Sequence, residues 1–68
     1  MKLTERQAAV VRGIAAGDSD TEIGQALGVT ARTVRMHYQV AAKKLGVKER
    51  RRIPLAYFEQ TRDDPWPR

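Results

Sequence analysis

The chain has 68 residues, of which 41% are hydrophobic and only 6% aromatic, so it can form one small domain with a modest core. A deep enzyme pocket is therefore not expected, and we predict no catalytic activity. The chain has no cysteine and a single histidine, which excludes disulfides, thiolate zinc sites and Cys/His catalytic pairs. No cofactor or metal is expected. No apolar run approaches the length of a membrane span or of a signal-peptide core, so the expected location is the cytoplasm.

The net charge of +5 is concentrated in one segment. Residues 30–53 hold eight basic and one acidic side chain, whereas the segments before and after this one each carry a net charge of −1. A basic block confined to one segment is typical of a protein that binds a phosphate backbone. Ribosomal or membrane-surface binding would also suit a basic patch, so charge alone does not decide between them.

The first predicted helix begins after Thr4. Thr4 and Gln7 have the spacing of a capping box, and the helix is expected to run to about Ala16, with Gly17 ending it. Gly13 inside this helix lowers its stability by about 1 kcal/mol relative to alanine, a cost that close packing would explain. Four residues form the apolar face: Leu3, Val10, Val11 and Ile14.

A second, shorter helix is predicted between Ser19 and Leu27. Ser19 and Glu22 form another capping box, and Gly24 suggests a place where two crossing helices approach closely. The turn Gly28-Val29-Thr30 follows, in which glycine can adopt positive φ and threonine can cap the next helix. Two helices joined by a short glycine turn form the helix-turn-helix pattern.

The third predicted helix runs from about Ala31 to Leu45, with Thr30 as N-cap and Gly46 after its end. Spacing of about 100° per residue gives it two different faces. The apolar stripe consists of Val34, Tyr38, Ala41 and Leu45. The opposite face consists of Arg32, Arg35, Met36, Gln39 and Lys43. Arginine and glutamine match guanine and adenine edges in the major groove, and methionine can contact a thymine methyl group. The alternative is an ordinary amphipathic helix with a solvated basic face.

The segment LTERQAAVVRGIAAGDSDTEIGQALGVTARTVRMHYQVAAKKLGV resembles the LuxR-type (GerE-like) helix-turn-helix domain of bacterial transcription regulators. The matching pieces, within residues 3–58, are Leu3-Thr4, Arg6, Gly17, Glu22-Ile23, Leu27-Gly28, Thr33-Val34, His37, Lys44-Leu45-Gly46-Val47 and Arg50. This resemblance implies a small all-α, four-helix (tetrahelical, winged-helix-like) fold whose third helix enters the major groove and whose fourth helix commonly pairs two subunits. It also implies that Arg35, Met36 and Gln39 face bases.

The contacts expected with DNA fall into two groups. The base contacts are Arg35, Met36, Gln39 and Arg32. The phosphate contacts are Thr30, Thr33, His37, Lys43, Lys44, Arg50, Arg51 and Arg52. As an alternative to phosphate contact, His37 could be an ordinary surface residue. The three consecutive arginines could likewise be a run of solvated side chains that contact no phosphate.

The fourth helix is expected to begin near Arg52, because Pro54 fits only the first turn of a helix. Leu55, Tyr57 and Phe58 are the candidates for a dimer interface, and the alternative is that they close the core over the first and third helices. The domain is assigned to residues 1–62. Residues 63–68 form a proline-broken tail that we expect to fray, with docking of Trp66 as the alternative.

The predicted function is sequence-specific binding of double-stranded DNA by a stand-alone transcription regulator at the nucleoid, with pairing of two copies expected at least on DNA. Family members commonly carry a further domain ahead of this one, for which these residues leave no room. The alternative is a small interaction module, an anti-activator or a protein like the promoter-reading region of sigma factors, that acts on another regulator or on RNA polymerase. RNA or membrane binding is disfavoured, since no stacking aromatics or wide apolar face accompany the charge.

Overall fold

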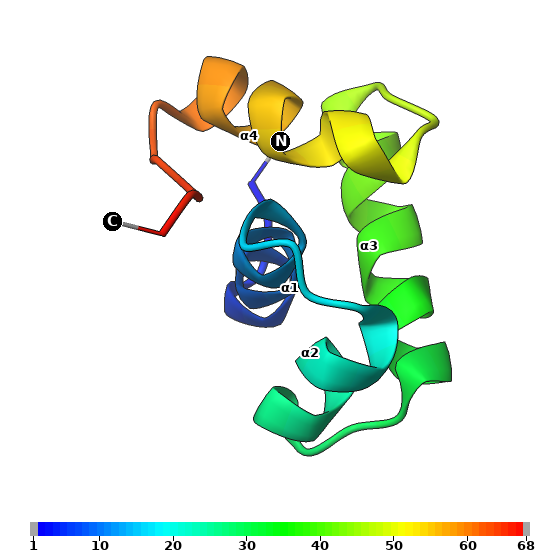
Figure 1. The fold of residues 1–68 in the computed structure, drawn as a ribbon. Helices are drawn as coiled ribbons and strands as arrows, with labels where there is room; N and C mark the ends of the chain where they lie inside the picture. Colours follow the sequence, from blue (N-terminus) through cyan, green and yellow to red (C-terminus); the bar gives the residue numbers. More distant parts are fainter. Residues whose placement is uncertain (1, 68) are drawn as a thin grey trace.

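The computed structural model describes residues 2–67, which form four α-helices and one 3₁₀ turn with no strand. In chain order these are α1 (Glu5–Ala15), α2 (Asp20–Leu27), α3 (Ala31–Leu45), the 3₁₀ turn η1 (Arg50–Arg52) and α4 (Ile53–Thr61). The long helix α3 contacts each of the other three α-helices, with α2 at its first half and α4 across its other end (Figure 1). The expected all-α, four-helix fold is confirmed. The outermost residues of the predicted domain and tail, Met1 and Arg68, lie outside the described residues.

The first two helices begin with the predicted capping boxes. The Gln7 amide donates to Thr4 Oγ1 at 3.1 Å, and the Thr4 amide donates to the Gln7 side chain at 3.0 Å. Ser19 and Glu22 make the same reciprocal pair at the start of α2, with distances of 3.1 and 2.8 Å. Each box satisfies amides that the helix itself leaves without partners, which is why sequence predicts these helix starts closely.

The turn between α2 and α3 has the predicted conformation. Gly28 has φ of 74°, the left-handed region that glycine enters without steric cost, and Thr30 Oγ1 accepts from the Thr33 amide at 3.2 Å. Arg6 from α1 donates to the Leu27 carbonyl at 3.2 Å, so it caps the end of α2. These contacts fix the angle at which α3 leaves the turn.

The core lies where α1, α3 and α4 meet, with Ile23 supplied by α2. Its buried members are Val10, Val11, Ile14, Ile23, Val34, Ala41, Ala42, Leu45, Ile53, Ala56 and Tyr57. The predicted stripe of α3 is confirmed at Val34, Ala41 and Leu45. Tyr38 is only half-buried at the edge of this core, and Ala42, which was not predicted, is buried instead.

Two glycines mark close approaches. A Cβ atom on Gly13 would lie 2.6 Å from Cγ1 of Ile23, so the glycine lets α2 pack tightly on α1. A Cβ atom on Gly24 would lie 2.6 Å from the Val29 carbonyl oxygen. The expected close approach at Gly24 is therefore present, and the backbone that meets it is the turn Val29–Thr30 together with Ala31, the first residue of α3.

The helix α4 starts one residue after Arg52, as the position of Pro54 predicted. Pro54 occupies its first turn, and η1 leads into it. Ile53 is fully buried and secures this start against the core. Gln60 donates to the Leu45 carbonyl at 2.7 Å, which satisfies a terminal carbonyl of α3.

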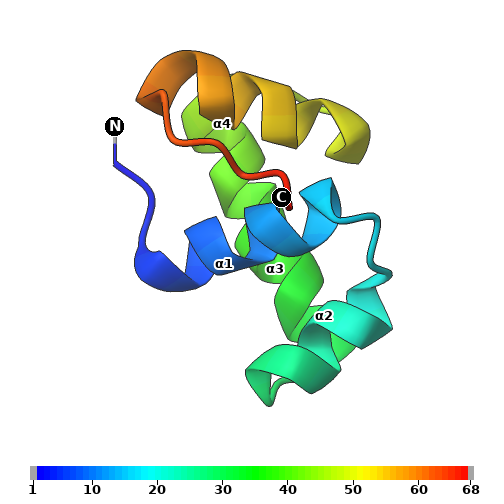
Figure 2. The same ribbon diagram turned by 60° about the vertical axis from the view of Figure 1, so that its left-hand side comes forward.

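The tail folds back from the end of α4 toward α1 (Figure 2). Pro65 is buried, and the Trp66 ring meets the Phe58 ring edge-on with centroids 5.9 Å apart. The Asp63 carboxylate accepts from the Tyr57 hydroxyl. The pKa of Tyr57 is raised, mainly because its hydroxyl is buried and to a smaller extent because it interacts with Asp63. The frayed end was therefore the wrong expectation, and the docked alternative describes residues 63–67.

Candidate nucleic-acid interface

The exposed face of α3 carries the side chains expected on it. Five are solvent-exposed: Arg32, Arg35, Met36, Gln39 and Lys43. Met36 is 59% exposed, although methionine usually lies inside proteins. Val40, one turn after Met36, is 44% exposed and extends the same face. Val40 is absent from the face predicted from the sequence, although its i+4 spacing from Met36 is a signal for it.

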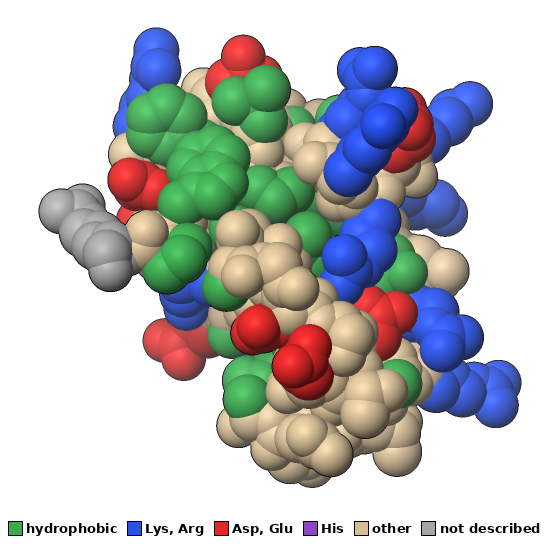
Figure 3. Space-filling view, in the orientation of Figure 1, with side chains coloured by type: hydrophobic (Ala, Val, Ile, Leu, Met, Phe, Trp, Pro, Cys, Tyr) green, Lys and Arg blue, Asp and Glu red, His purple; other side chains and the backbone are tan. Residues whose placement is uncertain are grey.

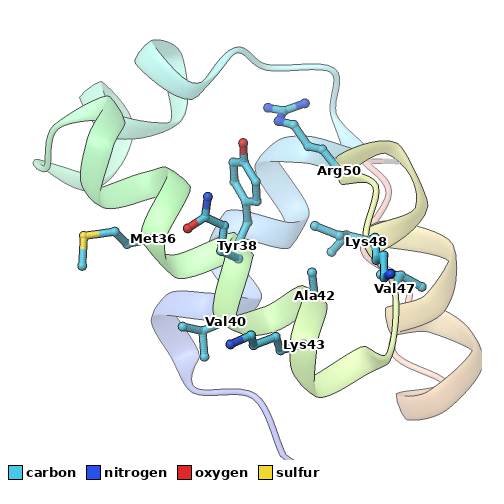
Figure 4. Close-up of a pocket in the computed structure, with 10 residues that line it drawn as sticks. Met36, Tyr38, Val40, Ala42, Lys43, Val47, Lys48 and Arg50 are labelled. Carbon is cyan, nitrogen blue, oxygen red and sulfur yellow. The ribbon is translucent and has the colours of Figure 1, made fainter.

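A groove runs beside this face, between α3 and the segment that leads into η1 (Figure 4). Apolar atoms of Val40, Ala42 and Val47 line it, and Lys43 and Lys48 stand at its edge. Lys48 was not among the predicted site residues, although it belongs to the basic segment. The groove thus combines apolar contact with positive charge next to the exposed face of α3.

Arg50 is engaged within the chain. Its Nε and Nη2 atoms donate to Asp20 Oδ1 at 3.2 and 3.0 Å, and Nη2 also donates to the Asp18 carbonyl at 3.0 Å. Its guanidinium carbon lies 5.6 Å from the centroid of the Tyr38 ring, a cation–π contact. Arg50 therefore ties η1 to the start of α2 and to α3, a structural role that its prediction as a phosphate contact did not include.

Other cations of the basic segment also have partners. Lys44 Nζ donates to Gln7 Oε1 at 2.9 Å and to the Lys2 carbonyl at 3.4 Å. Arg51 and Arg52 both pair with Glu49, at 3.1 and 3.0 Å, and remain largely exposed. Exposed pairs of this kind contribute little to stability and can exchange partners, so these two arginines stay accessible to a phosphate.

Arg32, Lys43 and Lys48 form no ion pair or side-chain hydrogen bond with any of residues 2–67. Lysine and arginine side chains gather on the side of the molecule formed by α3 and η1, and hydrophobic side chains gather over α4 and the tail (Figure 3). Positive charge thus concentrates on the side of α3 and η1, where Met36 and Val40 add exposed apolar surface, and a second apolar surface lies over α4 and the tail.

The remaining predicted phosphate contacts lie on the flanks of α3. Thr30 and Thr33 share a hydrogen bond between their hydroxyl groups at 3.1 Å, and His37 is half-buried. No cluster of three or more potential metal ligands occurs among the described residues. None of the helices within residues 2–67 is long and apolar enough to cross a membrane.

The three candidates for a dimer interface differ in exposure. Leu55 is 54% exposed, and Phe58 is half-buried beneath Trp66. Tyr57 is only 5% exposed, because its ring belongs to the core that α4 completes. Tyr57 therefore offers almost no surface to a second copy, and the expectation that it contributes to a dimer interface was wrong.

The helices α2 and α3 are joined by the Gly28 turn, α1 packs against both, and α3 carries an exposed basic face. This arrangement defines a helix-turn-helix domain. Residues 1–55 match the GerE family, described as bacterial regulatory proteins of the luxR family. The chain belongs to this family, and it contains the helix-turn-helix domain of a DNA-binding transcription regulator.

One curated relative is the nitrate/nitrite response regulator protein homolog of Haemophilus influenzae (strain ATCC 51907 / DSM 11121 / KW20 / Rd), which is 37% identical over 60 residues. The match covers 88% of this chain and 29% of the relative. The chain thus spans less than a third of the length of that protein. No solved structure matches the chain.

Proposed function

We propose that the chain binds double-stranded DNA sequence-specifically as a transcription regulator, with α3 in the major groove. The observation that carries this proposal is the exposed face of α3, where Arg35, Met36 and Gln39 stand together on a rigid helix. Their donors, acceptors and apolar atoms complement base edges. Family membership supports DNA as the ligand, and a DNA-binding role would bring the protein to the nucleoid.

The phosphate contacts in this proposal surround α3. Lys43 and Lys48 stand at the groove beside it, and Arg51 and Arg52 project from η1. Thr30, Thr33 and His37 flank the start and middle of α3. Cationic groups near the end of the helix, with hydroxyl and imidazole groups along its start and middle, suit contacts with the phosphate backbones that border a major groove.

Tight binding in this proposal requires two copies, since one helix reads only a few base pairs. The exposed Leu55, together with Phe58, is the proposed contact between copies on DNA. The DNA target would then be an inverted repeat with half-sites about one helical turn apart. Selected duplexes with a single half-site, bound by one copy of the protein, would contradict this part.

The proposal is tested by selection of bound sequences from random duplex DNA, followed by affinity measurements over a range of salt concentration. We expect a slope of log affinity against log salt of roughly −4 to −7 per subunit, from about 0.9 per neutralised phosphate. The value should lie near the shallow end, because Lys44 and Arg50 are engaged within the chain. A slope near zero with every duplex tested would refute DNA binding.

A second candidate is binding of a protein, another regulator or RNA polymerase, through the same side of the molecule. The apolar groove that contains Val40 and Val47 favours this candidate, because base reading does not require such a lining. Pull-down of partner proteins, run beside the DNA selection, distinguishes the two. A partner retained by a protein that shows no duplex preference would favour the second candidate.

A further inference from the structure

Asp20, the first residue of α2, lies between two arginines from different parts of the chain. Its Oδ1 atom accepts from Arg50 Nη2 at 3.0 Å and from Arg50 Nε at 3.2 Å. Its Oδ2 atom lies 3.4 Å from Nε of Arg35. Each carboxylate oxygen therefore serves a different arginine, and the second oxygen connects α2 to the exposed face of α3.

The carboxylate is held firmly enough to orient a neighbour. The Asp20 side chain is only 21% exposed, and Arg50 is itself fixed by the Asp18 carbonyl and the Tyr38 ring. Asp20 also sits in the first turn of a helix that is capped by Ser19, where negative charge is favoured. The anion that faces Arg35 is thus part of the scaffold.

The contact leaves the outer edge of the Arg35 guanidinium available. The carboxylate approaches Nε, and neither Nη nitrogen has a partner among the residues that the structure describes. The side chain is 56% exposed. Guanine is read by a bidentate contact in which an arginine donates to O6 and N7. A carboxylate beside Nε attracts that edge of the guanidinium, and in this orientation the paired Nη donors point away from Asp20 and stay available for this contact.

We propose that Asp20 is a positioning residue that determines how strictly Arg35 selects its base pair. This inference rests on the proposed function, in which Arg35 contacts a base edge. A long arginine without a fixed neighbour can also turn toward a phosphate, which carries no sequence information. Pre-organisation by Asp20 favours the base contact, and the negative charge of Asp20 weakens binding to every duplex.

The test measures affinity for the selected duplex and for duplexes altered at single base pairs, with wild-type, Asp20→Asn and Arg35→Ala proteins. Asparagine retains an oxygen that can accept from Arg50 but loses the charge that attracts Arg35. We expect Asp20→Asn to reduce discrimination at the base pair read by Arg35 by about five- to tenfold, within the range of one bidentate contact. Discrimination at the other base pairs should stay the same. In the Arg35→Ala background, Asp20→Asn should cause no further loss of discrimination.

Asp18→Asn is the matched control, because it removes one negative charge two residues away. Asp18 contacts Arg50 through its backbone carbonyl, which the substitution retains. Both asparagine variants should bind random duplex as tightly as wild type or more tightly, but only Asp20→Asn should change discrimination. Thermal unfolding followed by circular dichroism verifies that each variant is folded at the assay temperature.

Three results would overturn the inference: unchanged discrimination in Asp20→Asn, an equal change in Asp18→Asn, or uniform weakening at all base pairs. Increased discrimination would also overturn it, because Asp20 would then hold Arg35 away from DNA. These results are distinct from failure of the proposed function. In that case the wild-type protein would bind all duplexes alike, or Arg35→Ala would leave every preference intact.

Discussion

The exposed face of α3 and the basic flank that follows it are both rich in cations, but the two regions differ in what those cations contact. On the face, Arg32 and Lys43 have no partner within residues 2–67, and Arg35 pairs with Asp20 only through Nε. On the flank, which begins at Lys44 in the last turn of α3, Lys44 donates to Gln7 of α1, and Arg50 donates to Asp18 before α2 and to Asp20 at its start. A count of basic residues therefore overstates the charge that is available to a ligand, because some cations hold helices together.

The largest effect is expected from the residues proposed to contact bases. Arg35→Ala or Gln39→Ala should cost about 1–3 kcal/mol on the selected duplex and relax the choice at one base pair. Effects on random duplex should be much smaller. Competitive binding with duplexes altered at single positions measures this, and Arg51→Ala is the control, since it should weaken all sequences alike. A changed preference in Arg51→Ala, with Arg35→Ala unchanged, would mean that α3 is rotated from the orientation proposed.

The second effect concerns stability. Arg50→Ala removes three hydrogen bonds and leaves the shielded Asp20 carboxylate without its principal partner. We expect a loss of about 1–2 kcal/mol in the free energy of unfolding, less than for a fully buried pair because Arg50 is partly solvated. Arg32→Ala, on the exposed face, should change it by less than about 0.5 kcal/mol. Urea denaturation measures both, and equal values would remove the distinction between the two regions.

Adjacent lysines give a sharper comparison, because Lys43 has no partner among the described residues and Lys44 donates to the buried Gln7. Lys43→Ala should reduce the magnitude of the salt slope by about one and leave stability unchanged. Lys44→Ala should lower stability by about 0.5–1.5 kcal/mol and change the slope less. Salt titration and urea denaturation of the same two proteins decide this. The sequence alone predicted a phosphate contact at Lys44, and a full unit of slope lost there would confirm that prediction.

The smallest effect on stability is expected from a substitution of Glu22 in the N-terminal cap of α2, the helix that carries Asp20. Hydrogen bonds from Ser19 hold the pKa of Glu22 below its ordinary value. Glu22 therefore stabilises the fold above its unfolded-state pKa, and this contribution is lost as pH falls through the lower folded-state value. The difference in unfolding temperature between wild type and Glu22→Gln should shrink toward zero over that acidic range. The cost of Thr4→Ala should not follow this titration, since the cap of α1 pairs Thr4 with the neutral Gln7.

Local signals predicted most of the fold. Capping boxes at Thr4 and Ser19 determined where two helices begin, and Gly28 and Gly46 determined where two helices end. Pro54 placed the start of α4 correctly because its constraint acts within one turn. Each of these effects depends on residues a few positions apart, so sequence is sufficient to recognise it.

Contacts between distant residues were harder to predict. Nothing local shows that Arg50 would meet Asp20, 30 positions away, or that Lys44 would meet Gln7, 37 positions away. The faces of α3 follow from periodicity, but the partners of each cation depend on how the helices pack. The direction in which the tail folds back was hard to predict for the same reason, because the surface that receives Trp66 exists only after α4 has folded.

The contact between Trp66 and Phe58 provides an optical probe that needs no label. The chain has one tryptophan, so all indole fluorescence comes from this position. Trp66 is 39% exposed, and its indole ring meets Phe58 on α4 near the proposed contact between copies. Release of the tail would move the indole into water and shift its emission to longer wavelength. Pairing of two copies through Leu55 and Phe58 would bury it further and shift the emission the opposite way. Association on DNA can therefore be followed in solution with the unmodified protein.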